Sequence, residues 1–357
     1  MSVTDKSTIR LYFIPLKFNE DVKRKYLAEW IKPFFPKNRL SSFGLNSELY
    51  VKCENPAHAH IFILPLTWNY YFEMDIVNYA SNMIAKYLYY DKPIFTWANG
   101  DFKLKIPGGN FFLFQNNCYH SKRKINEYAY PVIIRDPLKY LHMSSIKILD
   151  KENIPKIGFC GLSDNSWFDV LKSSTKNQIR KLKYRLVKPF LDMSEPISGT
   201  SLRYSIIKKL RYSKHLHTDF IIRSSYGGQS VNNEKHKREY WKNLLECPYI
   251  LCARGAGNYS TRFYESLAVG RIPIFINTDC MLPFEKNIEE NKHYISININ
   301  ELDSIEEIII NYHNKISSTD FKEIQYANRI LWEKMLTFDG FMDSFLKNIN
   351  TKVIKNF

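Results

Sequence analysis

Short apolar runs alternate with helical patterns along most of the chain, and this alternation constrains the fold more than any other feature. Apolar runs typical of buried strands lie at 9–14, 59–65, 93–97, 111–115, 131–134, 156–161, 219–223, 248–253 and 272–276. Apolar residues spaced three or four apart predict helices at 69–89, 166–188, 238–245, 260–269, 301–317 and 320–350. Strands that alternate with helices usually form parallel sheets covered by helices, so the sequence predicts an α/β protein.

The length of 357 residues corresponds to about two domains of average size. The polar segment 150–155 ends in a proline, which favours a domain boundary there. We therefore expect Rossmann-like domains over residues 1–152 and 153–330, facing each other across a cleft. A terminal helix over 331–357 would pack back toward the first domain. In such sheets ligands bind at the carboxyl ends of the strands.

The charge balance favours an anionic partner. The chain carries 51 Lys and Arg against 36 Asp and Glu, a net charge of +15. Nucleic acid, an acidic membrane or a phosphorylated small molecule would each suit this excess. The six cysteines form no Cys-x-x-Cys pair, and the histidines lack zinc-site spacing, so we expect buried reduced thiols and no metal site.

The most informative segment is 248–276, where a strand leads into a Gly-x-Gly loop, a helix and a second strand. Gly255 and Gly257 let a ligand approach the backbone closely. Ser260 is suited to cap the helix. The backbone amides of Ser260, Thr261 and Arg262 lie at the start of this helix, where helices bind anions. Arg262 adds a cation, and Glu265 lies on nearly the same helix face.

These parts together predict a pocket for a nucleoside diphosphate, with the carboxylate holding the ribose hydroxyls. The simpler alternative is a solvent-exposed ion pair between Arg262 and Glu265, worth about 0.3–0.5 kcal/mol. The order of strand, glycine loop, cap, arginine, glutamate and strand favours the pocket.

At this point the sequence resembles the exostosin family of glycosyltransferases. The resemblance rests on Arg254-Gly255, on Ser-Thr-Arg-x-x-Glu-Ser-Leu-x-x-Gly-x-Ile-Pro-Ile over 260–274, and on Asp279 with Leu-Pro-Phe at 282–284. It covers roughly residues 155–290. The family implies the GT-B architecture of two Rossmann-like domains, inversion at the sugar carbon, and a nucleotide-sugar held by the C-terminal domain without a bound divalent ion.

The resemblance also implies roles for individual residues. Arg262 would bind phosphate, Glu265 would bind ribose, and Arg254 would lie near the phosphate or the sugar. The N-terminal domain would bind the acceptor, a glycan or a polyprenyl-linked glycan. This chain looks more like a bacterial relative that builds capsule, O-antigen or lipopolysaccharide than like the animal members.

An inverting transfer needs a base that takes the proton of the acceptor hydroxyl. Asp101 is the first candidate, because it lies in the turn after the strand at 93–97. Glu73 and Asp75, which follow the strand at 59–65, are the other candidates. The structural alternative for Asp101 is that it satisfies backbone groups of the turn.

The helix predicted at 166–188 carries a strongly basic surface. Residues 172–188 contain seven basic side chains and no acidic one, beside an apolar stripe. We expect a cytoplasmic protein that contacts the anionic inner face of the plasma membrane through 172–188. A solvated helix face is the alternative. Nucleic-acid binding is not expected, because no recognisable nucleic-acid-binding module is evident.

Other functions remain open at this stage. A fucosyltransferase-like enzyme would differ in its donor, and a catalytically inactive glycan-binding module would lack affinity for diphosphates. A basic nucleic-acid-binding protein would bind oligonucleotides in a salt-dependent way that no nucleotide-sugar displaces.

Overall fold

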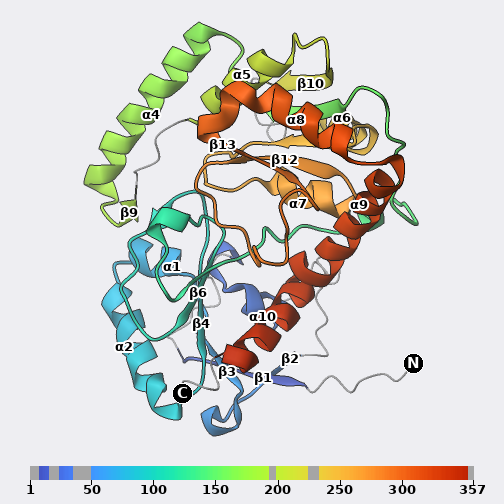
Figure 1. The fold of residues 1–357 in the computed structure, drawn as a ribbon. Helices are drawn as coiled ribbons and strands as arrows, with labels where there is room; N and C mark the ends of the chain where they lie inside the picture. Colours follow the sequence, from blue (N-terminus) through green and yellow to red (C-terminus); the bar gives the residue numbers. More distant parts are fainter. Residues whose placement is uncertain (1–7, 16–23, 35–49, 193–197, 224–232, 353–357) are drawn as a thin grey trace, which may run out of the picture.

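The computed structural model describes residues 8–15, 24–34, 50–192, 198–223 and 233–352. Within them, two parallel α/β sheets form two lobes (Figure 1). The N-terminal lobe is built around strands between residues 9 and 129, and the C-terminal lobe is built around strands between 156 and 298. The expected fold class, two Rossmann-like domains that face each other, is confirmed.

The sheet of the N-terminal lobe has the order β2-β1-β3-β4-β6-β7, and its described pairs are parallel. Its strands are β1 (Ile9–Phe13), β2 (Tyr50–Lys52), β3 (Ile61–Ile63), β4 (Ile94–Ala98), β6 (Phe112–Gln115) and β7 (Glu127–Ala129). β4 and β6 are buried along their whole length, because helices cover both faces of this sheet.

The helical segment expected at 69–89 is two helices, α1 (Trp68–Glu73) and α2 (Val77–Tyr87). The chain breaks between them at Asp75, whose φ of 55° is left-handed and cannot continue a helix. Trp68 and Tyr71 of α1 and Ile84 of α2 are buried in the core of the lobe. The apolar spacing continued across the break, so the pattern alone concealed it.

The prediction of a strand at 131–134 is also wrong. These residues form no strand, and the edge strand β7 lies just before them. β7 contains Glu127, which is buried and pairs with Lys103 Nζ at 2.7 Å. A short helix, α3 (Pro137–Tyr140), follows the apolar segment.

The sheet of the C-terminal lobe has the order β10-β8-β11-β12-β13, with parallel pairing throughout. Its strands are β8 (Lys156–Leu162), β10 (His217–Arg223), β11 (Tyr249–Cys252), β12 (Ile272–Asn277) and β13 (Ile295–Asn298). The chain leaves β8 toward β10 on one side and leaves the adjacent β11 toward β12 on the other, so the connections after β8 and β11 diverge. That divergence leaves a crevice at the carboxyl ends of the strands, where ligands of such sheets bind.

Helices cover both faces of this second sheet. The covering helices are α5 (Gly199–Leu210), α6 (Asn233–Glu246), α7 (Thr261–Ala268), α8 (Ile305–Lys315) and α9 (Ser318–Leu331), whereas α4 (Trp167–Val187) lies outside them and contacts α5. Alternate residues of β11 divide between the two faces. Tyr249 and Leu251 pack with α5 and α8, whereas Ile250 and Cys252 pack with α6 and α7.

The segment expected as one helix at 320–350 is instead α9, a π-helical stretch at Trp332–Leu336, and α10 (Phe338–Lys352). It runs from the C-terminal lobe to the N-terminal lobe (Figure 1). Phe338, Phe341 and Phe345 of α10 lie in the core of the N-terminal lobe. The ring of Phe345 is 4.8 Å from that of Phe114 on β6. The helix expected at 301–317 begins only at Ile305, after a 3₁₀ stretch.

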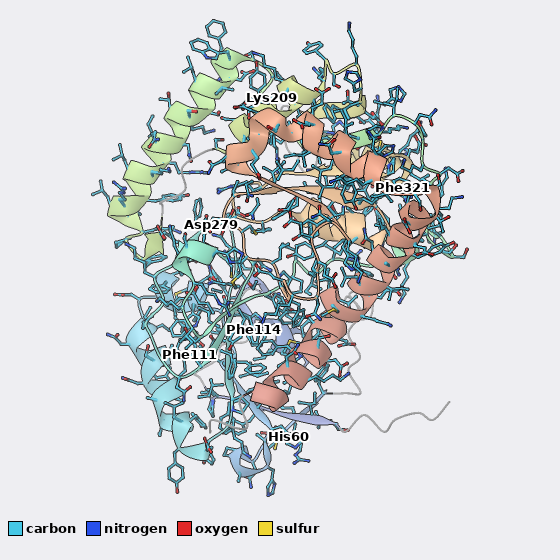
Figure 2. The ribbon with its side chains drawn as sticks, viewed as in Figure 1. His60, Phe111, Phe114, Lys209, Asp279 and Phe321 are labelled. Carbon is cyan, nitrogen blue, oxygen red and sulfur yellow. The ribbon has the colours of Figure 1, made fainter. Side chains whose placement is uncertain are left out.

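Several contacts join the lobes besides this helix. Strand β5 (Lys103–Leu104) pairs antiparallel with β9 (Leu191–Asp192), which follows α4. Arg329 of α9 makes two hydrogen bonds of 2.9 Å to the carboxylate of Asp136. Asp279 lies where the lobes meet (Figure 2) and accepts hydrogen bonds from the backbone and hydroxyl of Ser121. The lobes are therefore tied at several points around the crevice.

Candidate active site

The carboxyl ends of the two sheets meet at the loop after β11. Tyr259 of this loop donates a hydrogen bond of 3.0 Å to Asp101 Oδ1, which follows β4. The backbone N–H of Asn258 donates to Asn117 Oδ1, after β6, at 2.7 Å. The turn that holds Asp101 therefore lies directly opposite the Gly-x-Gly loop.

A cavity of about 370 Å³ lies at this junction. Its lining comes from the ends of β8, β10 and β11, from α5, α6 and α7, and from the turn after β4. The lining residues are Asp101, Cys160, Gly161, Leu162, Arg203, Arg223, His236, Lys237, Tyr240, Trp241, Gly255, Ala256, Gly257, Tyr259, Ser260, Thr261, Arg262 and Glu265. Most of the residues singled out from the sequence thus surround one space.

The Gly-x-Gly loop fits closely against the opposite lobe. A Cβ atom on Gly257 would lie 3.0 Å from Cα of Asp101 and 2.6 Å from the ring of Tyr259. Ser260 stands at the N-cap position of α7 with extended backbone, although its hydroxyl makes no capping hydrogen bond. The amides of Thr261 and Arg262 lack intrahelical acceptors by geometry, and both residues line the cavity, whereas the amide of Phe263 donates to the carbonyl of Ser260.

Arg262 extends from α7 to the end of β8. Its Nη2 donates a hydrogen bond of 2.7 Å to the carbonyl of Cys160, and its guanidinium lies 4.6 Å from the centre of the Phe159 ring. Gly161 permits this position, because a Cβ there would lie 2.6 Å from Nη2. The buried Nε of Arg262 has no hydrogen-bond acceptor among the described residues. Arg262 is therefore fixed at the cavity wall, and its Nε–H donor is not used within the described protein.

The structure adds cations that the sequence analysis did not single out as site residues. Arg203 of α5 donates to the carbonyls of Leu162 and Ala253. Arg223 at the end of β10 donates to Glu239 at 3.1 Å, and Lys237 of α6 also lines the cavity. With Arg262, the cationic side chains outnumber the two carboxylates of the lining, so the cavity attracts anions.

No local motif marks these residues, which come from three separate elements. The position of Arg223 at the carboxyl end of a strand was the one available signal.

Glu265 is held by a neighbour from α6. The hydroxyl of Tyr240 donates a hydrogen bond to Glu265 Oε2. Burial raises the pKa of the Glu265 carboxyl above its ordinary value, although the Tyr240 hydrogen bond and the Arg262 charge act in the opposite direction. The simple surface ion pair between Arg262 and Glu265 does not occur in the described structure, since their hydrogen bonds go elsewhere.

We expect Glu265→Gln to raise the melting temperature of the ligand-free protein by a few degrees at about pH 8. The folded state holds the Glu265 proton more tightly than the unfolded chain does, so ionisation costs stability as the pH rises above 4.5. Glutamine keeps an acceptor for Tyr240 without this cost. The gain should shrink toward about pH 5 in thermal unfolding measurements. Glu246→Gln, at the exposed end of α6, is the control. A pH-independent loss of stability would contradict the expectation.

Three predicted residues lie outside the cavity lining. Arg254 is buried behind the loop, and its Nη2 donates to the carbonyl of Ala256 at 3.3 Å. Glu73 accepts a hydrogen bond from the hydroxyl of Tyr26, and Asp75 is exposed in the turn between α1 and α2. Among the three candidate bases, Asp101 alone lines the cavity.

Among the described residues, no group of three or more His, Cys, Asp or Glu side chains could hold a metal ion. Cys118, Cys160, Cys247, Cys252 and Cys280 are buried free thiols, as the sequence analysis expects, whereas Cys53 is a free thiol that is only half-buried. No helix in the described part of the chain has the length and apolar character to cross a bilayer.

Comparisons with known proteins leave the family open. No protein-family model matches the chain, and no curated protein matches it with significance. The crystal structure of TarM aligns at 9% identity with a TM-score of 0.29, over 71% of this chain and 54% of that one. A glycosyltransferase from Rickettsia africae ESF-5 aligns at 10% identity with a TM-score of 0.38, over 98% of this chain and 100% of the other.

At such TM-scores neither likeness carries a conclusion about this chain. The exostosin resemblance rests on the residues that suggested it.

Proposed function

We propose that this chain is an inverting glycosyltransferase that moves a sugar from a nucleotide-sugar to a glycan or lipid-linked glycan, as in the synthesis of bacterial surface polysaccharide. The observation that carries the proposal is the cavity itself. One wall is cationic and includes the start of α7, and the opposite lobe contributes a single carboxylate, Asp101. This arrangement suits a diphosphate on one side and an incoming hydroxyl on the other.

In the proposed reaction Asp101 accepts the proton of the acceptor hydroxyl. At the same time the oxygen of that hydroxyl forms a bond to the anomeric carbon of the donor sugar. The bond from that carbon to the phosphate oxygen breaks, and its electron pair leaves on the diphosphate. Arg203, Arg223 and Arg262 stabilise the new negative charge, so the proposal calls for no bound divalent ion. Glu265, oriented by Tyr240, would accept hydrogen bonds from the ribose.

A panel of nucleoside diphosphates and nucleotide-sugars tests the proposal by thermal shift. A ligand at 100 times its Kd should add about 2.7 kcal/mol to the stability of the fold, which allows donors to be ranked. Nucleoside monophosphates are the matched control and should bind more weakly, because they lack one phosphate for the cationic wall. If no diphosphate or nucleotide-sugar stabilises the protein, the proposed function is wrong. Preference for a guanosine diphosphate sugar of fucose would favour the fucosyltransferase-like alternative.

A further inference from the structure

Helix α4 lies at the edge of the molecule, and its apolar side faces away from the protein. It follows β8 and lies outside the C-terminal lobe, and its end near β9 reaches the N-terminal lobe (Figure 1). None of its residues from Trp167 to Val187 is buried. A helix of this length in a globular protein ordinarily buries its apolar side.

Most apolar side chains of α4 face solvent, although Val170 is half-buried. The exposed ones are Trp167, Phe168, Leu171, Ile179, Leu182, Leu186 and Val187. At about 100° per residue, all of them except Val187 fall within one arc of about 120°. Leu186 is 85% exposed and Phe168 is 76% exposed. The apolar face is therefore uncovered by the described residues, and the exposed polar residues Thr175 and Gln178 divide it into a part at each end of the helix.

The polar side of α4 makes the contacts with the protein. Ser173 donates a hydrogen bond of 2.7 Å to the buried Asp164. Tyr184 packs edge-on against Phe102, with ring centroids 5.8 Å apart, and the guanidinium of Arg180 lies 5.3 Å from the same ring. Ser173, Arg180 and Tyr184 lie opposite the apolar arc on the helix. The amphipathic pattern thus points outward, which is the reverse of a core-packing helix.

Basic side chains flank the exposed apolar arc. Lys172, Lys176 and Lys183 lie along one side of it, and Lys181 and Arg185 lie along the other. The one acidic residue of the helix, Asp169, is held at its first turn by the Ser166 hydroxyl. An apolar stripe bordered by lysines is the pattern of helices that lie in the interface of a bilayer.

We propose that the exposed face of α4 is a docking surface for an anionic lipid bilayer. Apolar side chains would enter the acyl boundary while the flanking lysines and arginine reach the headgroups. A second copy of the chain fits less well, because pairing two such helices would bring their basic flanks together. A nucleic acid could bind the basic side chains, but its phosphates would bury little of the apolar surface formed by the central leucines and aromatic rings.

The position of α4 connects this surface to the cavity. Phe102, against which Arg180 and Tyr184 pack, is the residue after Asp101. If the proposed function holds, a bilayer on α4 would present a lipid-linked acceptor close to the candidate base. Docking itself does not depend on the proposed function, and the test below measures binding alone.

The test uses sedimentation with phosphatidylcholine vesicles made with and without phosphatidylglycerol. Wild type should bind the anionic vesicles and bind neutral ones far more weakly. Leu182→Ser/Leu186→Ser and Lys172→Gln/Lys176→Gln/Lys183→Gln should each lower partition by about tenfold or more. These substitutions alter exposed side chains, so thermal unfolding should remain that of wild type.

Matched control variants replace the same kinds of exposed side chain outside α4. Tyr89→Ser/Ile125→Ser removes two exposed apolar side chains from the N-terminal lobe, and Lys86→Gln/Lys214→Gln/Lys286→Gln removes three exposed charges. Both should bind vesicles as wild type does. Trp167 provides a second readout, because its emission should shift to the blue on anionic vesicles. The shift should disappear in Trp167→Phe.

Three results would overturn the proposal. The first is absence of wild-type binding to anionic vesicles, or equal binding by the α4 and control variants. The second is a wild-type dimer in analytical ultracentrifugation that Leu182→Ser/Leu186→Ser dissociates, which would make the face a self-association surface. The third is oligonucleotide binding that the lysine variant abolishes and the leucine variant retains, without vesicle binding by wild type.

Discussion

Asp101→Asn is expected to bind the donor as wild type does and to lose about 10²–10⁴-fold in transfer rate. The side chain lines the cavity from the lobe opposite the cationic wall, where a base must stand to receive the acceptor proton. Asparagine has the same shape and still offers an oxygen to Tyr259, but it cannot take a proton. The measurement is the rate of nucleoside-diphosphate release with acceptor, together with donor affinity by calorimetry.

Tyr259→Phe distinguishes two roles of Asp101, a general base and a hydrogen-bond partner that joins the two lobes. It removes the hydrogen bond of 3.0 Å to Asp101 and leaves the carboxylate in place. If Asp101 acts as the base, Tyr259→Phe should retain most of the rate that Asp101→Asn loses. Equal losses in the two variants, or near-normal turnover in Asp101→Asn, would contradict the assignment.

Arg262→Ala is expected to weaken nucleoside-diphosphate binding by about 10²-fold, in line with the loss of one enclosed charged partner. The guanidinium is fixed by Cys160 and Phe159, so it loses little freedom when it meets a phosphate. Arg262→Lys should recover only part of the affinity, because lysine lacks the planar fork. Isothermal titration at physiological salt is the measurement.

The control for Arg262 removes an equal charge at a distance. Arg211→Ala, at the exposed end of α5, should leave the affinity within a few-fold of wild type. Thermal unfolding of Arg262→Ala checks that the wall has kept its structure, because the Cys160 carbonyl loses its donor. Affinity unchanged in both Arg262 variants would reject this wall as the phosphate site.

The sequence predicted those elements whose own residues supply most of their stability. The buried strands β4, β6, β11 and β12 are nearly continuous apolar runs, and their positions are confirmed. β5 and β9 have two residues each and exist through pairing with one another, so no local pattern marks them. β7 contains a charged residue whose partner, Lys103, comes from another strand.

For the candidate site, the sequence predicted the loop, the start of α7 and Asp101, because each is a local pattern at the end of a strand. It could not indicate that Arg203, Arg223 and Tyr240 share the same cavity, since that depends on the order of strands. The partner of Glu265 was missed for the same reason. Tyr240 precedes it by 25 positions and approaches from a different helix.

The packing of α10 has a consequence for how the protein is made. Phe338, Phe341, Met342 and Phe345 complete a core whose other buried members lie between residues 11 and 130. During synthesis the N-terminal lobe therefore emerges before the C-terminal lobe but lacks part of its interior until α10 follows. The C-terminal lobe can acquire most of its buried contacts earlier, so the order of folding need not follow the order of translation.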